Sequence, residues 1–361
     1  GARLMAALRA ESGGRVRFTG IGGEEMTRQG LKSRFPIREL AVMGFLEVLP
    51  HLFVILRRLR ETVAAVRATR PDAVVTIDSP SFTLEVAQRL KGAGMPLIHY
   101  VAPQVWAWKP WRARQIGRYL DHLLALLPFE PPYFEKHGLA THFVGHPVVE
   151  AGPPPATPSE AQSGPCLVVL PGSRKGEVGK LLPVFTEVVG ALAETHPDLR
   201  VVIPTVETVE ELVRARTAAW PLAVEVVRGA EARTKAFAEA TAALAASGTV
   251  ALELAVAGVP AVIAYRFAGF VGFLPMAWLG VPFASLVNII SKREVQPEFL
   301  QRNCRAAAIL PAVARLLDDP GARESQRAAY GDVIAALSPP EGTPSRAAAR
   351  CILAAIGQQK S

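Results

Sequence analysis

The amino-acid sequence predicts an α/β protein built from two doubly wound domains. Short β-branched runs alternate with helix-length amphipathic segments along almost the whole chain, which is typical of parallel sheets covered by helices. A stretch rich in proline, glycine, alanine and serine over residues 152–165 separates the halves, as an interdomain linker would. The 361 residues are long for one core and sufficient for two. We expect domains over 1–150 and 166–340 that face each other across a central cleft, and a helix over 341–361 that packs back on the first domain.

Five short apolar runs in each half predict the strands. In the first half they are Val16–Thr19, Ala73–Ile77, Leu97–Val101, Leu123–Leu126 and His142–Val144. In the second half they are Leu167–Leu170, Arg200–Ile203, Val224–Val227, Ala242–Ala245 and Ala261–Ala264. The chain opens on an amphipathic helix over residues 1–9, where a chain of this class normally opens on a strand. We therefore expect the first strand of the first domain to be missing.

The composition narrows the class of protein. Half of the residues are hydrophobic and 20% are charged, which indicates a globular chain. The three cysteines form no CxxC pair, which argues against a disulfide framework or a zinc site. No apolar run reaches the roughly 20 residues that span a bilayer, and no signal peptide is visible. The net charge of +8 favours phospholipid head groups or phosphorylated metabolites as partners. Nucleic acid is disfavoured because the sequence holds none of its usual binding motifs.

Two small-residue turns in the second half predict a site for a nucleotide diphosphate. Each follows an apolar run, and such a turn before a helix directs free backbone N–H groups toward an anion. An arginine in the first turn can fork onto a diphosphate, and a glutamate one turn into the second helix can accept the hydroxyls of a ribose. The candidates are Gly172, Ser173, Arg174, Ser247, Gly248, Thr249 and Glu253. The alternatives are a surface arginine, an ordinary helix N-cap and a solvated glutamate.

The first half offers a different chemistry. Asp78 follows an apolar run, where a carboxylate can act as a general base on an alcohol, and an N-cap for the next helix is an equal alternative. The aromatic segment His99–Trp108 can form a surface for a sugar or an acyl chain, although a loop that caps the core is equally common. His146 can be a hinge or a site residue, but a lone histidine is more often structural.

Residues 45–60 predict a very apolar amphipathic helix with a basic end. Its apolar set is wider than one core-facing stripe needs, which predicts contact with a membrane interface, with coverage of the sheet as the alternative. A second apolar candidate, 267–279, is broken by glycine and proline. The candidate acceptor or membrane residues are Met43, Phe45, Leu49, Leu52, Phe53, Leu56, Trp106 and Trp108.

Several motifs are absent from the sequence. There is no D-x-D pair, no Walker A loop, no G-x-S-x-G elbow and no cluster of metal ligands, and Gly20–Gly23 lacks the third glycine of a dinucleotide loop. We therefore expect neither a metal nor a cofactor. The charge of a leaving diphosphate would then be neutralised by Arg174 and the helix ends.

A set of motifs spread over nearly the whole chain resembles the lipid-A-disaccharide synthases, inverting glycosyltransferases of the GT-B fold. The most specific are V-W-A-W at 105–108 and L-P-G-S-R at 170–174. The others are Glu39–Gly44, Ile77–Pro80, His99–Pro103, Leu127–Glu130, Phe143–Pro147, Ala246–Thr249, Tyr265–Arg266 and Asn288. The resemblance implies transfer of 2,3-diacylglucosamine from its UDP derivative to 2,3-diacylglucosamine 1-phosphate, with a β(1→6) linkage and release of UDP.

The resemblance also implies roles for residues. Asp78 and Arg174 match positions that the family needs for activity, and Tyr265, Arg266, Asn288 and Glu298 lie in stretches that border the donor site. Because the substrates of the family are acylated, the resemblance implies that the helix over 45–59 docks on the anionic surface of the inner membrane. The resemblance thus implies a peripheral protein on the cytoplasmic side of that membrane in a Gram-negative bacterium. The oligomeric state stays open, with a homodimer as one alternative.

The chain departs from the family pattern at two places. The family begins with a strand and a loop that contributes to the cleft, and this sequence starts after them. The family often has a second aspartate where Ser81 stands here, so Asp78 is the only local candidate for the base.

Two alternative functions for the chain remain: a UDP-N-acetylglucosamine epimerase of the same fold, and a non-catalytic peripheral membrane protein.

Overall fold

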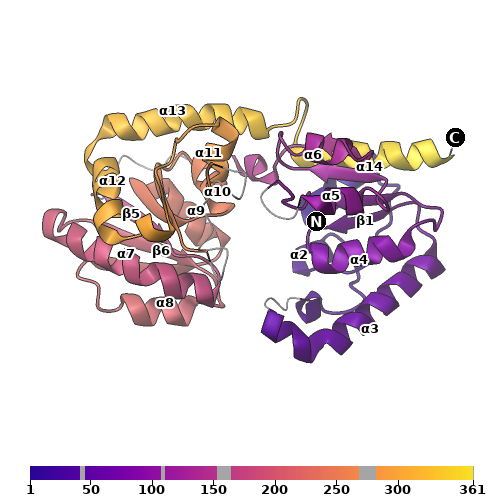
Figure 1. The fold of residues 1–361 in the computed structure, drawn as a ribbon, viewed down its shortest axis with the longest axis horizontal. Coiled ribbons are helices and arrows are strands. Elements are labelled where there is room, and N and C mark those ends of the chain that lie inside the picture. Colours follow the sequence, from indigo (N-terminus) through magenta and orange to yellow (C-terminus); the bar gives the residue numbers. More distant parts are fainter. Residues whose placement is uncertain (41–44, 107–109, 153–163, 268–281, 361) are drawn as a thin grey trace. The chain divides into compact units, whose positions relative to one another are not determined.

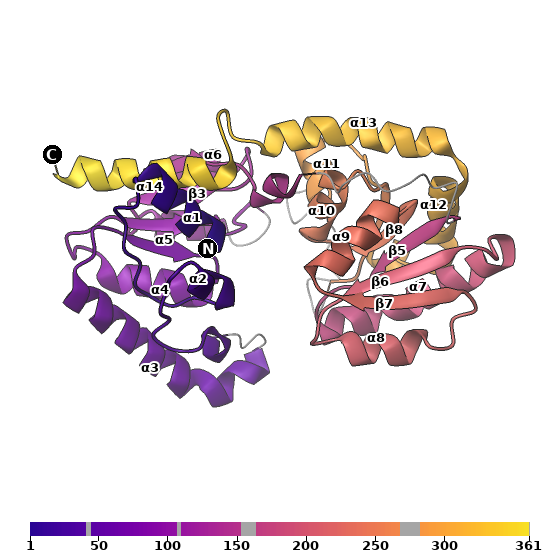
Figure 2. The same cartoon turned by 180° about the vertical axis from the view of Figure 1, so that it is seen from behind.

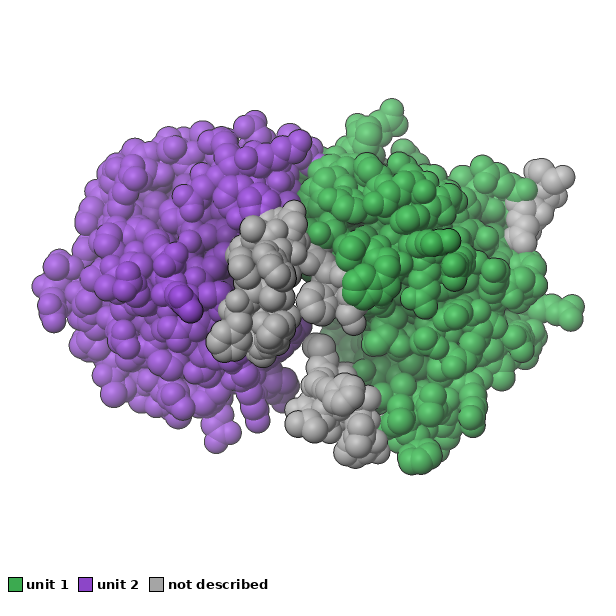
Figure 3. Space-filling view, in the orientation of Figure 1, with its two compact units in different colours: residues 1–147, 337–361 green, residues 148–336 purple. Residues whose placement is uncertain are grey.

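The computed structural model describes residues 1–40, 45–106, 110–152, 164–267 and 282–360, without the side chains of 45–51 and 359–360. It divides into two compact units (Figure 3). Unit 1 comprises Gly1–Pro147 and Leu337–Ser361, and unit 2 comprises Val148–Ala336. Each unit holds one parallel sheet with helices packed against it, so the predicted α/β fold with two Rossmann-like domains is confirmed.

Unit 1 contains a four-stranded parallel sheet in the order β1-β2-β3-β4. The strands are β1 Val74–Ile77, β2 Leu97–Tyr100, β3 His122–Ala125 and β4 Ala140–Phe143, which confirms four of the five predicted ones. The prediction of a strand at Val16–Thr19 is wrong. Val16 and Phe18 pack against the apolar cluster below α1, but their backbone pairs with no strand of the described chain, and only Gly20 forms a bridge, to Ser33.

Helices cover both faces of the unit 1 sheet (Figure 1). Successive side chains of a strand point to opposite faces, so Leu97 joins the cluster under α3, α4 and α5, while Ile98 joins the cluster under α1 and α14. Glu11 of α1 accepts hydrogen bonds from Arg346 and Arg350 of α14 at 2.7 and 3.0 Å. The helices of this unit are α1 Ala2–Glu11, α2 Glu24–Arg28, η1 Ile37–Leu40, α3 Phe45–Thr69, α4 Pro80–Leu90, α5 Trp111–Ile116, α6 Pro131–Glu135 and α14 Pro344–Lys360.

Unit 2 contains a six-stranded parallel sheet in the order β10-β9-β8-β5-β6-β7. The strands are β5 Cys166–Leu170, β6 Arg200–Thr205, β7 Ala223–Arg228, β8 Ala242–Ala246, β9 Ala261–Tyr265 and β10 Glu298–Leu300. All five predicted strands are present. Strand β10 was not predicted, because it is only three half-buried residues long at the edge of the sheet and is too short to show a hydrophobic pattern.

The central strands of unit 2 are buried on both faces, as a doubly wound sheet requires. Helices α7, α8 and α12 share one apolar cluster with β5, β6 and β8, and α9 and α10 lie on the other side of the sheet (Figure 2). The helices of the unit are η2 Pro147–Ala151, which starts on the last residue of unit 1, α7 Lys175–Thr195, α8 Glu210–Thr217, α9 Ala230–Glu239, α10 Val250–Val256, α11 Leu286–Ser291, η6 Gln301–Asn303, α12 Ala306–Asp318 and α13 Pro320–Leu337.

Candidate functional site

The two predicted anion loops leave neighbouring strands of the unit 2 sheet. Strand β5 pairs with β8 in parallel, and Leu170 lies opposite Ala245. The chain runs outward from β5 to β6 and β7 on one side and from β8 to β9 and β10 on the other, so the strand order reverses between β5 and β8. Open parallel sheets bind ligands at the carboxyl ends of the strands at such a switch point. The fold therefore places Pro171–Arg174 beside Ser247–Thr249.

The loop after β5 is fixed by a glutamate that the sequence analysis did not single out. Glu177, in the first turn of α7, accepts a hydrogen bond from the backbone N–H of Ser173 at 3.1 Å. Gly172 has a φ of 113°, and a Cβ at this position would collide with the Glu177 carboxylate. The glutamate three residues after the N-cap Arg174 is a capping-box spacing, so a sequence signal for it existed. The Arg174 side chain is exposed beyond this loop.

Tyr265 at the end of β9 belongs to the same cluster. Burial raises the pKa of Tyr265, the charge of Glu177 and its hydrogen bond raise it further, and the charge of Arg174 opposes them. The phenol therefore stays neutral and lies within electrostatic range of both residues. Its ring meets Phe267 edge-on, with centroids 4.9 Å apart. The structure thus brings Arg174, Glu177 and Tyr265 together at one edge of the sheet.

The loop after β8 carries the residues Ser247, Gly248 and Thr249. The Ser247 hydroxyl donates to the carbonyl of Ala284 at 3.0 Å, and Gly248 and Thr249 are exposed. Thr249 is the N-cap of α10, but no side-chain hydrogen bond caps this helix. Helix α10 has seven residues, so its dipole is small and exposed backbone N–H groups are the main feature of the loop.

Glu253 has a partner that the sequence did not indicate. Its carboxylate forms an ion pair with Arg233 of α9 at 3.0 Å, and 29% of the Glu253 side chain is exposed. The carboxylate therefore pairs with a cation of the neighbouring helix while part of it stays exposed to solvent. The ribose-binding role of Glu253 stays a prediction.

Asn288 and Glu298 bond each other beneath the β8 loop. Asn288 is fully buried, and its amide donates to Glu298 at 2.6 Å and to the Gln296 carbonyl at 2.8 Å. Its oxygen accepts from the N–H groups of Val295 and Gln296 at 2.8 and 2.9 Å. The four hydrogen bonds saturate this amide, so Asn288 braces the region and has no capacity left for a ligand.

Glu298 extends this bracing to the anion loop. Its carboxylate accepts from the N–H groups of Ala284 and Ser285 at 2.8 Å each, and Ala284 in turn accepts from Ser247. Burial raises the pKa of Glu298, and the three hydrogen bonds from these partners and Asn288 oppose the rise. Arg266 likewise turns inward and donates to the Cys304 carbonyl at 2.5 Å. Asn288 and Glu298 therefore support the β8 loop, whereas Arg266 contacts the chain before α12.

Asp78 and Ser79 at the end of β1 both adopt left-handed backbone conformations, with φ of 48° and 46°. Such residues, when not glycine, cost energy and concentrate at functional sites. Thr83 stabilises the turn by donating to the carbonyls of Asp78 and Ser79 at 2.5 and 3.0 Å. The N-cap of α4 is Ser79, and no side chain caps that helix. The exposed Asp78 carboxylate is therefore not an N-cap, and the general-base alternative remains.

The aromatic segment after β2 lies partly against the core. Trp106 is half-buried, donates to Glu130 at 3.3 Å and meets Phe129 edge-on at 5.2 Å. Trp108 lies outside the described residues. Burial lowers the pKa of His99 to about 4, so this imidazole stays neutral beside the Thr76 hydroxyl at 2.8 Å.

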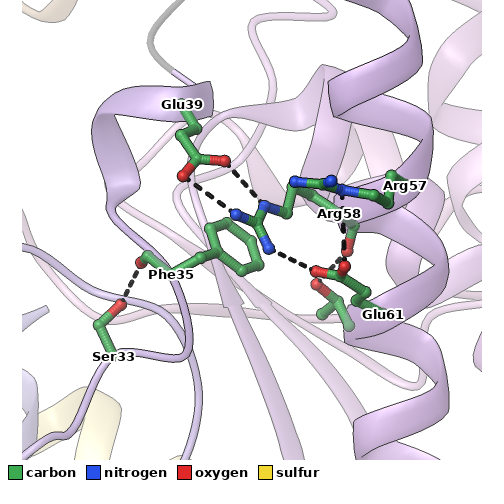
Figure 4. Close-up of polar contacts among 7 residues, drawn as sticks. Ser33, Phe35, Glu39, Arg57, Arg58 and Glu61 are labelled. Atoms are coloured by element: carbon green, nitrogen blue, oxygen red, sulfur yellow. Dashed lines mark hydrogen bonds and ion pairs between the residues drawn. The ribbon is translucent and has the colours of Figure 1, made fainter.

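Helix α3 exposes an apolar face in its first half. Phe53 is 83% exposed, Leu52 44% and Leu56 36%. The side chains of Phe45 and Leu49 are not among those described, and Met43 and residues 268–279 lie outside the described chain. Arg58 ties the helix to η1 through Glu39 (Figure 4). None of the described helices is both long enough and apolar enough to cross a bilayer.

His146 is structural in this fold. Its backbone N–H donates to the Leu337 carbonyl at 2.9 Å, where the chain returns to unit 1, and burial lowers the pKa of its imidazole to about 4. Gly145 has a φ of 82°, and a Cβ there would lie 2.9 Å from the Leu337 oxygen.

The described residues contain no cluster of histidine, cysteine, aspartate and glutamate that could hold a metal ion.

Comparison with solved structures supports the fold. The chain is similar to the calicheamicin glycosyltransferase CalG4, with a TM-score of 0.60, 20% identity and coverage of 99% of this chain and 94% of that one. It is also similar to the UDP-GlcNAc 2-epimerase from Neisseria meningitidis bound to UDP-GlcNAc, with a TM-score of 0.62, 11% identity and coverage of 92% and 95%. At these identities the likeness shows the GT-B fold and leaves the reaction open.

Sequence comparison distinguishes between glycosyl transfer and epimerisation. Residues 1–351 match the family model described as lipid-A-disaccharide synthetase. The lipid-A-disaccharide synthase of Rhodospirillum centenum is 50% identical over 365 residues, which cover 99% of this chain and 91% of that protein. With the switch-point loops of unit 2 and the strained Asp78 turn of unit 1 in place, the chain belongs to the lipid-A-disaccharide synthase family, glycosyltransferases of lipid A biosynthesis.

Proposed function

We propose that this chain transfers 2,3-diacylglucosamine from UDP-2,3-diacylglucosamine to the 6-hydroxyl of 2,3-diacylglucosamine 1-phosphate. The observation that carries the proposal is the pairing of β5 with β8, which sets two anion loops side by side at the switch point of unit 2. Membership of the family supports the reaction class. The products are a β(1→6)-linked tetraacyl disaccharide phosphate and UDP.

The donor half of the reaction is assigned to unit 2. The backbone N–H groups around Ser247–Thr249 and the exposed guanidinium of Arg174 neutralise the diphosphate. Glu253, held by Arg233, accepts the ribose hydroxyls. Gly172, Ser173 and Tyr265 shape the loop from which Arg174 reaches. Glu298 and Asn288 keep the β8 loop in position through Ala284, and Arg266 is held by the Cys304 carbonyl.

The acceptor half is assigned to unit 1. The Asp78 carboxylate takes the proton of the acceptor 6-hydroxyl as that oxygen attacks the anomeric carbon of the donor. A carbon–oxygen bond forms at one face of the sugar while the bond to UDP breaks at the other, so the configuration inverts and UDP leaves with the electron pair. The left-handed turn at Asp78 supports this role, since the carboxylate is exposed at the end of β1 and makes no capping hydrogen bond to α4.

We further propose that α3 docks on the anionic inner face of the bacterial inner membrane, where acylated substrates reside. Its exposed apolar side chains Leu52, Phe53 and Leu56 are followed along the helix by the exposed Arg57 and Arg60. An amphipathic helix of this composition lies in a membrane interface, and the net charge of +8 adds attraction to anionic lipid. The protein is then peripheral and cytoplasmic.

The test is to incubate the chain with both acylated sugars in the presence of anionic vesicles. The proposal predicts stoichiometric release of UDP and formation of a tetraacyl disaccharide phosphate, both followed by mass spectrometry. Conversion of UDP-N-acetylglucosamine to its 2-epimer without any acceptor would favour the epimerase. Binding to vesicles without UDP release or saturable UDP binding would favour a non-catalytic membrane protein.

A further inference from the structure

Glu130 is a buried carboxylate that the proposed chemistry does not use. It closes the motif Leu127–Glu130 after β3, and only 2% of the residue is exposed. Acidic side chains are seldom buried unless they have partners that need them. The hydrogen bonds to the Glu130 carboxylate therefore show which segments of the chain this residue holds together.

The Glu130 carboxylate joins the extensions of two neighbouring strands. One oxygen accepts from the N–H groups of Leu126 and Leu127 at 3.1 and 3.0 Å, which fixes the chain just beyond β3. The other oxygen accepts from the indole N–H of Trp106 at 3.3 Å, in the segment after β2. Strands β2 and β3 are paired in parallel, so both extensions lie at the carboxyl edge of the unit 1 sheet. That edge also carries Asp78, at the end of β1.

The segment that Glu130 holds is under backbone strain. Val101 has a φ of 81°, which is a left-handed conformation that β-branched residues strongly disfavour. Val105 donates to the Pro103 carbonyl at 2.7 Å in a three-residue turn. Ala102 and Val105 anchor the segment in the core, with 5% and 1% exposure. A strained segment needs several attachments: the Val101 N–H donates to the Leu124 carbonyl at 3.1 Å at its start, and the Trp106 indole donates to Glu130 at its end.

The surroundings of Glu130 suit a carboxylate, although burial of its charge is unfavourable. Burial raises the pKa of Glu130 to about 7, and the hydrogen bonds from Leu127, Trp106 and Leu126 oppose the rise. None of these three donors titrates. A glutamine has a single acceptor oxygen, so it could not accept from all three donors at once. The three N–H groups therefore match a carboxylate at this position.

We propose that Glu130 is a positioning residue for the acceptor: it holds the Trp106 indole at the carboxyl edge of β2, where the ring packs against the apolar part of an acylated sugar. Phe129 supports the same ring from its edge, with the two planes at 86°. The ligand class is an amphiphilic acyl sugar, because a half-buried indole offers apolar area with a polar rim. This inference rests on the proposed function.

The decisive variant is Glu130→Gln, with Glu135→Gln on the exposed side of α6 as the matched control. Loss of one charged hydrogen bond changes affinity by about tenfold. We expect the KM for the acceptor to rise about tenfold, with kcat and the KM for the UDP-sugar changed less than about twofold. Trp106→Phe should give the same change, and the double variant should give no further effect. The reason is that a glutamine whose oxygen stays on the N–H groups of Leu126 and Leu127 turns its NH2 group toward the indole N–H.

Tryptophan fluorescence follows the contact between Trp106 and Glu130 in the absence of substrates. Between pH 5.5 and 8.5 the intensity of the parent chain should titrate with a midpoint near 7, and Glu130→Gln and Trp106→Phe should each abolish that step. An unchanged acceptor KM in folded Glu130→Gln would overturn the inference, as would equal loss for donor and acceptor. A parent chain that titrates but forms no disaccharide would contradict the proposed function, whereas a parent chain that forms disaccharide without the titration would contradict only the role of Glu130.

Discussion

The Arg58 guanidinium donates to both carboxylate oxygens of Glu39, with its Nε and one terminal nitrogen 2.8 and 3.1 Å from them (Figure 4). The other terminal nitrogen reaches Glu61 at 2.6 Å, and Cζ lies 4.6 Å from the centre of the Phe35 ring. The hydrogen bond from Arg58 holds the pKa of Glu39 below its ordinary value. This forked contact joins α3 to η1, on the same helix that exposes Leu52, Phe53 and Leu56.

Replacing Phe53 with serine should weaken binding to anionic vesicles without lowering thermal stability. Phe53 is 83% exposed, so the fold loses little, whereas a membrane would bury most of the ring. Burial of such a ring contributes about 2 kcal/mol, so the partition coefficient should fall by more than about tenfold in vesicle sedimentation. The control is Val206→Ser, since Val206 is 43% exposed in unit 2. Equal losses in both variants would contradict docking through α3.

Replacing Gly172 with alanine should impair UDP binding. The new Cβ would collide with the Glu177 carboxylate, and a φ of 113° is unfavourable for any side chain. We expect at least about tenfold weaker UDP binding by calorimetry and a loss of about 1–2 kcal/mol in the free energy of unfolding. Gly190→Ala is the control, because Gly190 lies inside α7 with open space at its Cβ and should be neutral or stabilising.

Replacing Asn288 with alanine should lower both the melting temperature and the affinity for UDP. The change leaves the N–H groups of Val295 and Gln296 and the Glu298 carboxylate without their partner, at about 2–4 kcal/mol. The loop at Ser247 then loses its support through Ala284. Asn303→Ala, at an exposed position nearby, should change neither quantity. Weaker UDP binding at an unchanged melting temperature would show instead that Asn288 contacts the ligand directly.

Glu130 should make the stability of the fold depend on pH between about 5 and 8. Its pKa in the folded protein is about 7, above the ordinary 4.5, so the folded state binds the proton more tightly. Its contribution is therefore complete below the ordinary pKa and is lost as the pH rises through 7. From pH 5 to 8 the parent chain should lose about 2 kcal/mol relative to Glu130→Gln in chemical denaturation. Parallel profiles for the two proteins would contradict this assignment.

The strands that could be predicted are those whose residues carry a local signal. Strands such as Cys166–Leu170 are buried throughout, so their hydrophobic runs are visible in the sequence. Val16–Thr19 alternates apolar and polar residues as an edge strand would, but strand pairing depends on a neighbouring strand, which the composition of the segment does not reveal. Glu298–Leu300 is too short and too exposed to give a pattern, although it completes the edge of the sheet.

The candidate site was predictable as a set of positions, whereas the roles within it depend on contacts distant in sequence. The turns at Arg174 and Ser247 follow apolar runs, so their place at the ends of strands could be expected. The hydrogen bonds that saturate the Asn288 amide could not be predicted, because only the folded chain brings Glu298, Gln296 and Val295 next to it. The Arg58–Glu39 contact joins residues 19 apart, outside any helical spacing that a sequence pattern could indicate.

Disaccharide formation by Asp78→Asn, in the presence of both acylated sugars, tests whether Asp78 is the general base. Asparagine tolerates the left-handed backbone at φ 48° and keeps the size of the side chain, but it cannot take a proton. We predict an unchanged melting temperature, unchanged UDP binding and a fall in kcat of at least about a hundredfold. Turnover close to that of the parent chain would contradict the assignment of Asp78 as the general base.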